Sequence, residues 1–121
     1  MALDQTDCGL DVALAVIGGK WKPLILYHVS GGPRRFGELR RRVAGISEKV
    51  LIQQLRELEV DGIVARHDYQ EVPPRVEYSM TDDGMILATA LVPLCQWGNV
   101  NRSAVTARKQ TGRLTEEAPA M

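Results

Sequence analysis

The chain has 121 residues, of which 45% are hydrophobic and 25% charged, and its formal net charge at pH 7 is zero. This composition is ordinary for one globular domain with a terminal extension. No apolar run reaches the roughly 18 residues that cross a bilayer. The acidic, polar beginning MALDQTDCG is unlike a signal peptide, so we expect a cytoplasmic protein with no membrane partner.

Two short helices are predicted first, after a loose arm at residues 1–8. Apolar residues recur at helical spacing from Leu10 to Ile17, and Gly18-Gly19 ends the segment. Trp21 and Pro23 then open a second helix, because proline suits a first helical turn. The segment PLILYHV is apolar on nearly every side, so we expect it to lie buried at the centre of the fold.

Two further helices are predicted to form a helix-turn-helix. Residues 33–36 can be extended for a few positions, and FGELRRRV then carries apolar residues at helical spacing. The three arginines Arg40–Arg42 lie on its outer side, where they are either solvated or contact phosphates. Gly45 makes a turn, and a second helix follows it. Two helices joined by a short turn with a glycine are typical of DNA-binding helix-turn-helix motifs.

The stretch from Gly45 to Gly62, GISEKVLIQQLRELEVDG, contains the second helix of this pair. Ser47 is a favourable N-cap, and Gly62 is a favourable residue just past the helix end. One side of the helix repeats leucine at helical spacing, and the opposite side carries Lys49, Ile52, Gln53 and Arg56. An ammonium, an amide and a guanidinium can read base edges in a major groove. The alternative is a surface helix with a solvated face.

After Gly62 the period of the pattern changes to two, which predicts strands. The segments IVARHDYQEV and RVEYSM are joined through Val72-Pro73-Pro74. A hairpin in this place, after a helix-turn-helix, is a wing. Its tip is expected to place Arg75, and with it Arg66, near the DNA backbone or minor groove. Alternatively, Arg75 is the solvated arginine of a structural hairpin.

Thr81 is predicted to cap a last helix, which is strongly apolar from Met85 to Val100. A surface this apolar is not left exposed on a small monomer. The helix therefore either covers the core or pairs with a second subunit, and we favour pairing. Pro93 is expected to kink or break it. Residues 100–121 are predicted to be a flexible tail, which leaves residues 9–99 as the folded domain.

The net charge of zero conceals a segregation along the chain. Residues 20–66 contain ten Lys and Arg against five Asp and Glu, a net +5, whereas residues 1–19 and 67–98 carry −3 and −4. The basic segment contains the helix-turn-helix, so DNA is the expected partner. A winged-helix module that binds protein is the alternative. Two cysteines are too few for a zinc site, and no nucleophile–base motif or phosphate loop is present, so we expect no enzyme, metal or cofactor.

Four motifs, GGKWKPLIL, FGELRR, GISEKVL and PPRVEY, stand in the order and spacing of the HxlR-type transcription regulators, which the chain closely resembles over about residues 8–98. These are winged helix-turn-helix proteins related to the MarR group. The resemblance implies an α+β fold, mostly helical with a small antiparallel wing. It also implies a homodimer, held by the N-terminal helix and the helix after the wing, on a pseudo-palindromic double-stranded operator.

The resemblance further implies which residues meet DNA. Ser47, Lys49 and Gln53 fall on recognition-helix positions, and Arg75 falls on the wing arginine. With the neighbouring basic residues, the expected DNA-binding set is Arg34, Arg35, Arg40, Arg41, Ser47, Lys49, Gln53, Arg56 and Arg75. Ile52 departs from the family pattern, which usually has a small hydroxyl residue there. Isoleucine cannot donate a hydrogen bond, but it can contact a thymine methyl.

Two modes of control are expected, a thiol switch or a small-molecule effector. Cys8 stands where many family members carry a cysteine, which in some of them senses electrophiles or oxidants; the alternative is a boundary cysteine. Reactivity requires a thiolate and therefore a lowered thiol pKa. The acids near Cys8 in sequence would raise this pKa, whereas Lys20 or Lys22, if folded nearby, would lower it. Cys95 is expected to be packed in the apolar helix; the alternative is a resolving partner across a dimer. A small-molecule pocket between the wing and the dimer helices is expected to be lined by Trp21, Tyr27, His28 and Trp97. The alternative is that these four side chains are simply packed in the core.

Overall fold

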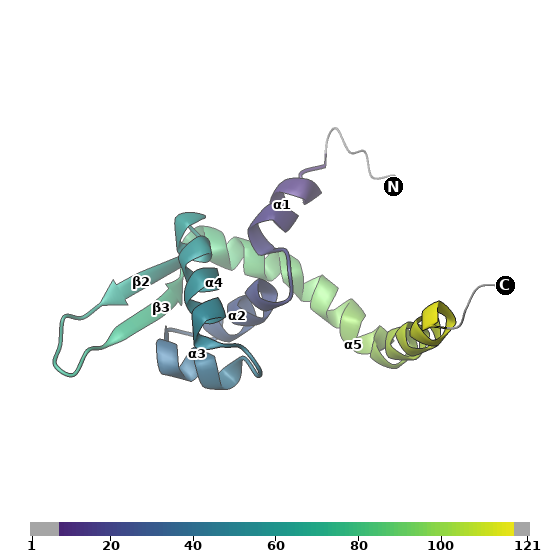
Figure 1. Cartoon of the computed structure of the whole chain (residues 1–121). Helices are drawn as coiled ribbons and strands as arrows, with labels where there is room; N and C mark the ends of the chain where they lie inside the picture. Colours follow the sequence, from purple (N-terminus) through teal and green to yellow (C-terminus); the bar gives the residue numbers. More distant parts are fainter. Residues whose placement is uncertain (1–7, 118–121) are drawn as a thin grey trace. The chain divides into compact units, whose positions relative to one another are not determined.

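The computed structural model describes residues 8–117 of the chain and is mostly helical, with one small sheet (Figure 1). Its elements in chain order are α1 (Leu10–Ile17), α2 (Trp21–Val29), β1 (Arg34–Arg35), α3 (Phe36–Arg42), α4 (Glu48–Val60), β2 (Val64–Asp68), β3 (Val76–Met80) and α5 (Asp82–Glu117). The chain divides after Ala88, within α5, into two compact units. The first unit contains the helix-turn-helix and the sheet.

The core of the first unit lies where α2 packs against α3 and α4 and where all three helices pack on the sheet. Its fully buried side chains are Ile25, Leu26, Val29, Leu39, Val43, Leu51, Leu55, Leu58 and Val64. The prediction that PLILYHV is buried all round was wrong on one side, because Leu24 is 42% and Tyr27 69% exposed. Helix α2 presents only one face to its neighbours, and its other face is open in this chain.

The sheet has three antiparallel strands in the order β1-β3-β2. Strands β2 and β3 form the predicted wing, and their connecting loop projects away from the helices (Figure 1). The predicted extended segment around Arg34 is the short strand β1, in which Arg34 pairs with Tyr78. Pairing of β1 with β3 ties the start of α3 to the base of the wing. The fold is therefore the winged helix-turn-helix expected from the sequence.

Local signals in the sequence set the ends of the helices around the wing. The hydroxyl of Ser47 accepts a hydrogen bond from the Val50 amide at 3.2 Å, which caps α4. Gly62 adopts a φ of 74°, a left-handed conformation that favours glycine just past a helix end. The hydroxyl of Thr81 accepts from the Gly84 amide at 2.9 Å and begins α5 as predicted.

Helix α5 is longer than the sequence predicted. Its secondary structure continues through Pro93 to Glu117, so the break considered at that proline does not occur. A proline inside a helix removes one hydrogen bond while the other bonds of the turn remain. The helix also continues into residues 100–117, and flexibility of that segment stays a prediction. Of the predicted N-terminal arm at residues 1–8, only Cys8 falls within the described residues.

Candidate nucleic-acid interface

Helix α4 has one buried face and one exposed polar face, as its sequence predicted. Leu51, Leu55 and Leu58 are at most 1% exposed and hold the helix against the core. On the other side, the side chains of Lys49, Gln53 and Arg56 are exposed. The residues that anchor α4 thus differ from those that it presents outward, so a partner can contact the polar face without disturbing the core.

An ion pair between α2 and α4 fixes the position of this helix. The Lys22 ammonium lies 2.6 Å from a Glu57 carboxylate oxygen, and Lys22 is only 8% exposed. The hydrogen bond and charge of Lys22 hold the pKa of Glu57 below its ordinary value, and a hydrogen bond from Gln53 adds to this effect. Sequence reasoning missed this pair, although a lysine within an otherwise apolar helix is a signal that a buried partner is needed.

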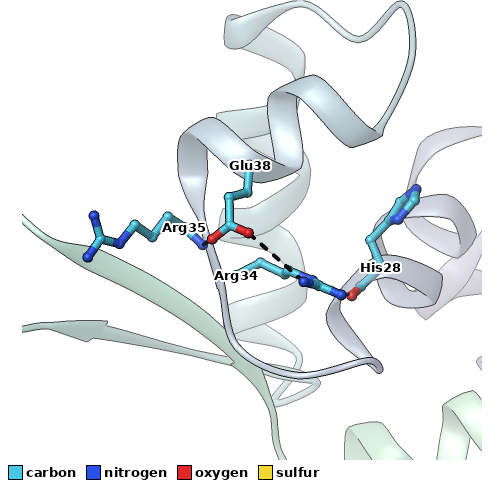
Figure 2. A network of polar contacts seen from close by, with 4 residues as sticks. All are labelled: His28, Arg34, Arg35 and Glu38. Atoms are coloured by element: carbon cyan, nitrogen blue, oxygen red, sulfur yellow. Dashed lines mark hydrogen bonds and ion pairs between the residues drawn. The ribbon is translucent and has the colours of Figure 1, made fainter.

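The two arginines of β1 have different environments, although they are adjacent in sequence. The Nε of Arg34 donates to the carbonyl oxygen of His28 at 3.0 Å, and its guanidinium lies 3.9 Å from Glu38. In Figure 2 this side chain points toward His28, whereas the side chain of Arg35 extends away from the network. Glu38 also accepts a hydrogen bond from the Arg35 amide at 3.1 Å, at the start of α3. Arg34 therefore has a structural role, and the Arg35 guanidinium is exposed.

The arginines of α3 form the remaining part of the predicted basic surface. Arg40 lies 3.2 Å from Glu48, the first residue of α4, and both side chains are more than half exposed. An exposed pair of this kind contributes little to stability, so a phosphate can compete for the guanidinium. Arg41 and Arg42 are exposed.

Arginines of this surface also affect His28 of α2. Burial of its ring, followed by the positive charges of Arg42 and Arg34, lowers the pKa of His28.

The wing arginine is held within its own hairpin. The guanidinium of Arg75 stacks 3.6 Å above the ring of Tyr69 and lies 3.5 Å from the Glu71 carboxylate. Its side chain is 32% exposed, and its buried Nε is without a hydrogen-bond partner among the described residues. A hydrogen bond to Glu77, followed by burial, raises the pKa of Tyr69. Arg75 thus shapes the wing tip and leaves only part of its guanidinium to solvent.

The residues of the two predicted modes of control have separate surroundings. Cys8 is half-buried just before α1, and Cys95 is exposed on α5 rather than packed. The two lysines considered as neighbours of Cys8 are engaged elsewhere, because Lys20 lies over the Trp21 ring and Lys22 pairs with Glu57.

The predicted effector-pocket residues also have contacts of their own. The exposed Tyr27 ring meets the edge of His28 at 5.1 Å between ring centroids. Trp97 belongs to the second unit, where it lines an open hollow of about 380 Å³ with Cys95 and Arg102. It stays a prediction that one ligand is bound by Trp21, Tyr27, His28 and Trp97.

Within the described residues, no helix is both long and apolar enough to cross a membrane. Among residues 8–112, whose side chains the structure describes, no group of three or more His, Cys, Asp or Glu side chains is arranged to hold a metal ion. The exposed polar face of α4 and the arginines around it remain the principal candidate site.

Comparison with known proteins places this fold in a family. The HxlR-like helix-turn-helix profile matches residues 16–106. The chain is a member of the HxlR family. Its curated relatives include the HTH-type transcriptional regulators YkvN and YybR of Bacillus subtilis (strain 168). YkvN is 54% identical over 96 residues, which are 79% of this chain and 81% of that protein. YybR is 42% identical over 114 residues, which are 94% of this chain and 91% of that protein.

Solved structures of regulators share the fold. The redox regulator HypR in its reduced form has a TM-score of 0.78 at 44% identity, covering 83% of this chain and 99% of the HypR chain. Its oxidized form has a TM-score of 0.73 at 47% identity, covering 78% and 97%. A MarR-family regulator from Enterococcus faecalis V583 has a TM-score of 0.72 at 42% identity, covering 89% and 96%. The chain is thus a transcription regulator of the helix-turn-helix class.

Proposed function

We propose that this HxlR-family regulator binds a specific double-stranded DNA operator with α4 in the major groove. The observation that carries the proposal is the exposure of Lys49, Gln53 and Arg56 on the side of α4 opposite its buried leucines. These side chains supply hydrogen-bond donors and an amide acceptor, which is the chemistry that reads base edges. Around them, Arg35 and Arg41 offer exposed guanidinium groups to the phosphates.

The operator-binding form is proposed to be a homodimer. Helix α1 exposes Leu10 at 52% and Leu14 at 53%, and the second unit exposes Trp97 at 59% and Val100 at 84%. Exposed apolar surface of this kind is stabilised by burial against a partner. A second copy supplies a two-fold partner, and its recognition helix then meets a second half-site about one helical turn away. The expected operator is therefore pseudo-palindromic.

Selection from a randomised duplex library tests this function directly. The full chain is expected to enrich an inverted repeat, and its affinity should fall steeply with salt because each phosphate contact adds about −0.9 to the log–log slope. Analytical ultracentrifugation of the protein–DNA complex gives the number of copies bound. Failure to enrich any sequence, with a weak salt dependence, would favour a winged-helix module that binds protein instead.

We further propose that oxidation of Cys8 changes operator affinity. The similarity to both forms of the redox regulator HypR and the half-buried position of Cys8 before α1 support this. In the expected step, the Cys8 thiolate attacks one oxygen of hydrogen peroxide, a sulfur–oxygen bond forms, and hydroxide leaves with the electrons of the broken oxygen–oxygen bond. The product is a sulfenic acid that a thiol can reduce.

The thiol proposal is tested with matched cysteine variants. Cys8→Ser should bind DNA normally when reduced and should lose the response to hydrogen peroxide, whereas Cys95→Ser should keep that response. DNA affinity by fluorescence anisotropy, before and after peroxide, is the measurement. A full response in Cys8→Ser would remove Cys8 as the sensor and assign the response to another group, with the exposed Cys95 as the next candidate.

A further inference from the structure

The N-terminal half of α4 carries an apolar spot within its polar surface. Glu48, Lys49 and Ile52 line an open hollow of about 400 Å³. Ile52 is 41% exposed, although the leucines of the same helix are almost completely buried. The part of this large aliphatic side chain that stays exposed gains nothing from the core of its own chain. A partner that covers it must offer an apolar group to Ile52.

The charges around the hollow restrict what that group belongs to. The carboxylate of Glu48 accepts a hydrogen bond from Arg40 at 3.2 Å, so a cation from α3 compensates its charge. Lys49, which also lines the hollow, is exposed, and its ammonium can only donate hydrogen bonds. The hollow therefore suits a group with an apolar part beside a hydrogen-bond acceptor.

Thymine presents this combination in the major groove, where its C5-methyl group lies beside the O4 acceptor. Cytosine presents an amino donor in place of the acceptor and lacks the methyl, and the purines lack a methyl at this edge. We propose that this hollow reads a thymine in each operator half-site: Ile52 contacts the C5-methyl group, and Lys49 donates to O4. This inference rests on the proposed function and adds to it the identity of one base and the residue that selects it.

Removal of a single methyl group tests the inference. The probe is a duplex that the wild-type protein has selected from a randomised library, with each thymine of one half-site replaced in turn by 2′-deoxyuridine. At one position the wild-type protein should lose affinity by roughly fourfold, the effect of one methyl group left unburied. Ile52→Ala should bind the unmodified duplex more weakly and should show no further loss with deoxyuridine at that position.

A second variant of the same helix is the control for this comparison of thymine with deoxyuridine. Val60 is 81% exposed and lies outside the hollow, near the C-terminal end of α4. Val60→Ala removes a comparable aliphatic group, and it should keep the full wild-type sensitivity to deoxyuridine. Both substitutions are on exposed side chains, so circular dichroism and urea denaturation should show an unchanged fold.

The outcomes separate this inference from the proposed function. An enriched operator whose thymines all tolerate deoxyuridine would overturn the reading by Ile52 and leave specific DNA binding intact. Equal sensitivity of wild type and Ile52→Ala would assign the methyl contact to another residue and also overturn it. If no sequence is enriched at all, the proposed function fails, and the inference fails with it.

Discussion

Two basic regions of the first unit were predicted to contact DNA, and they differ in what their cations already bind. On α4, Lys49 and Arg56 are exposed and take part in no ion pair that the described residues show. In β1 and the wing, Arg34 is bonded to the His28 carbonyl and Arg75 is stacked on Tyr69 beside Glu71. The first region leaves its charge exposed to solvent, and the second uses much of its charge in contacts within the fold.

The comparison shows that a count of basic residues predicts the sign of a surface but not which cations are available. Availability depends on the nearest carboxylate or carbonyl oxygen, and that atom often belongs to another element. A guanidinium with a part-buried acceptor contributes to stability, whereas an exposed one contributes to binding a polyanion. Substitutions that separate stability from DNA affinity therefore test the comparison.

The largest expected effect contrasts the two faces of α4. Leu55→Ala should lower the free energy of unfolding by about 2–5 kcal/mol, because it leaves a cavity in a closely packed core. Ile52→Ala, on the exposed side of the same helix, should change it by no more than about 0.5 kcal/mol. Urea denaturation followed by circular dichroism measures both. Equal losses would mean that Ile52 is also part of the folded core.

The next effect concerns the polar face of α4. Lys49→Glu and Gln53→Ala should each weaken binding to the selected operator by roughly 1–3 kcal/mol, the range for a residue that contacts a base. Gln53→Ala should leave affinity for a scrambled duplex nearly unchanged, because a neutral amide adds little to non-specific attraction. Operator binding that is unchanged in both variants would exclude α4 as the recognition helix.

The adjacent arginines of β1 provide a matched pair. Arg34→Ala should lower the free energy of unfolding by about 1–2 kcal/mol, because it removes a hydrogen bond from a charged donor. Arg35→Ala should leave stability within about 0.5 kcal/mol. If Arg35 contacts a phosphate, its loss should also reduce the log–log salt slope of DNA binding by about 1. The reverse pattern would show that the two roles have been exchanged.

The smallest effect is a dependence of stability on pH through His28. Its pKa in the folded chain lies below the ordinary value of 6.5, so the unfolded chain binds the proton more readily. Stability from this group is therefore complete above the unfolded pKa and is lost as pH falls from there toward the lowered folded pKa. Urea denaturation at several pH values below neutrality should show a shallower decline for His28→Gln than for the wild type. Parallel curves for the two proteins would refute this assignment.

Local patterns in the sequence were sufficient to predict most of the elements. Leucines at helical spacing, Ser47 before them and Gly62 after them defined α4, because capping and periodicity depend on residues close together in the chain. The change to a period of two after Gly62 predicted the wing for the same reason. Continuation of α5 through Pro93 and into residues 100–117 was missed, because a proline or a polar composition weakens a helix without determining where it ends.

The sequence by itself determined the fold class, the extent of α4 and the positions of the basic residues around it. Only the tertiary structure decided which of these cations are available. Glu57 lies far from Lys22 in sequence, and the carbonyl that binds Arg34 of β1 belongs to α2. Periodicity and capping act within one element, whereas the acceptor nearest to a charged side chain is set by how separate elements pack on one another.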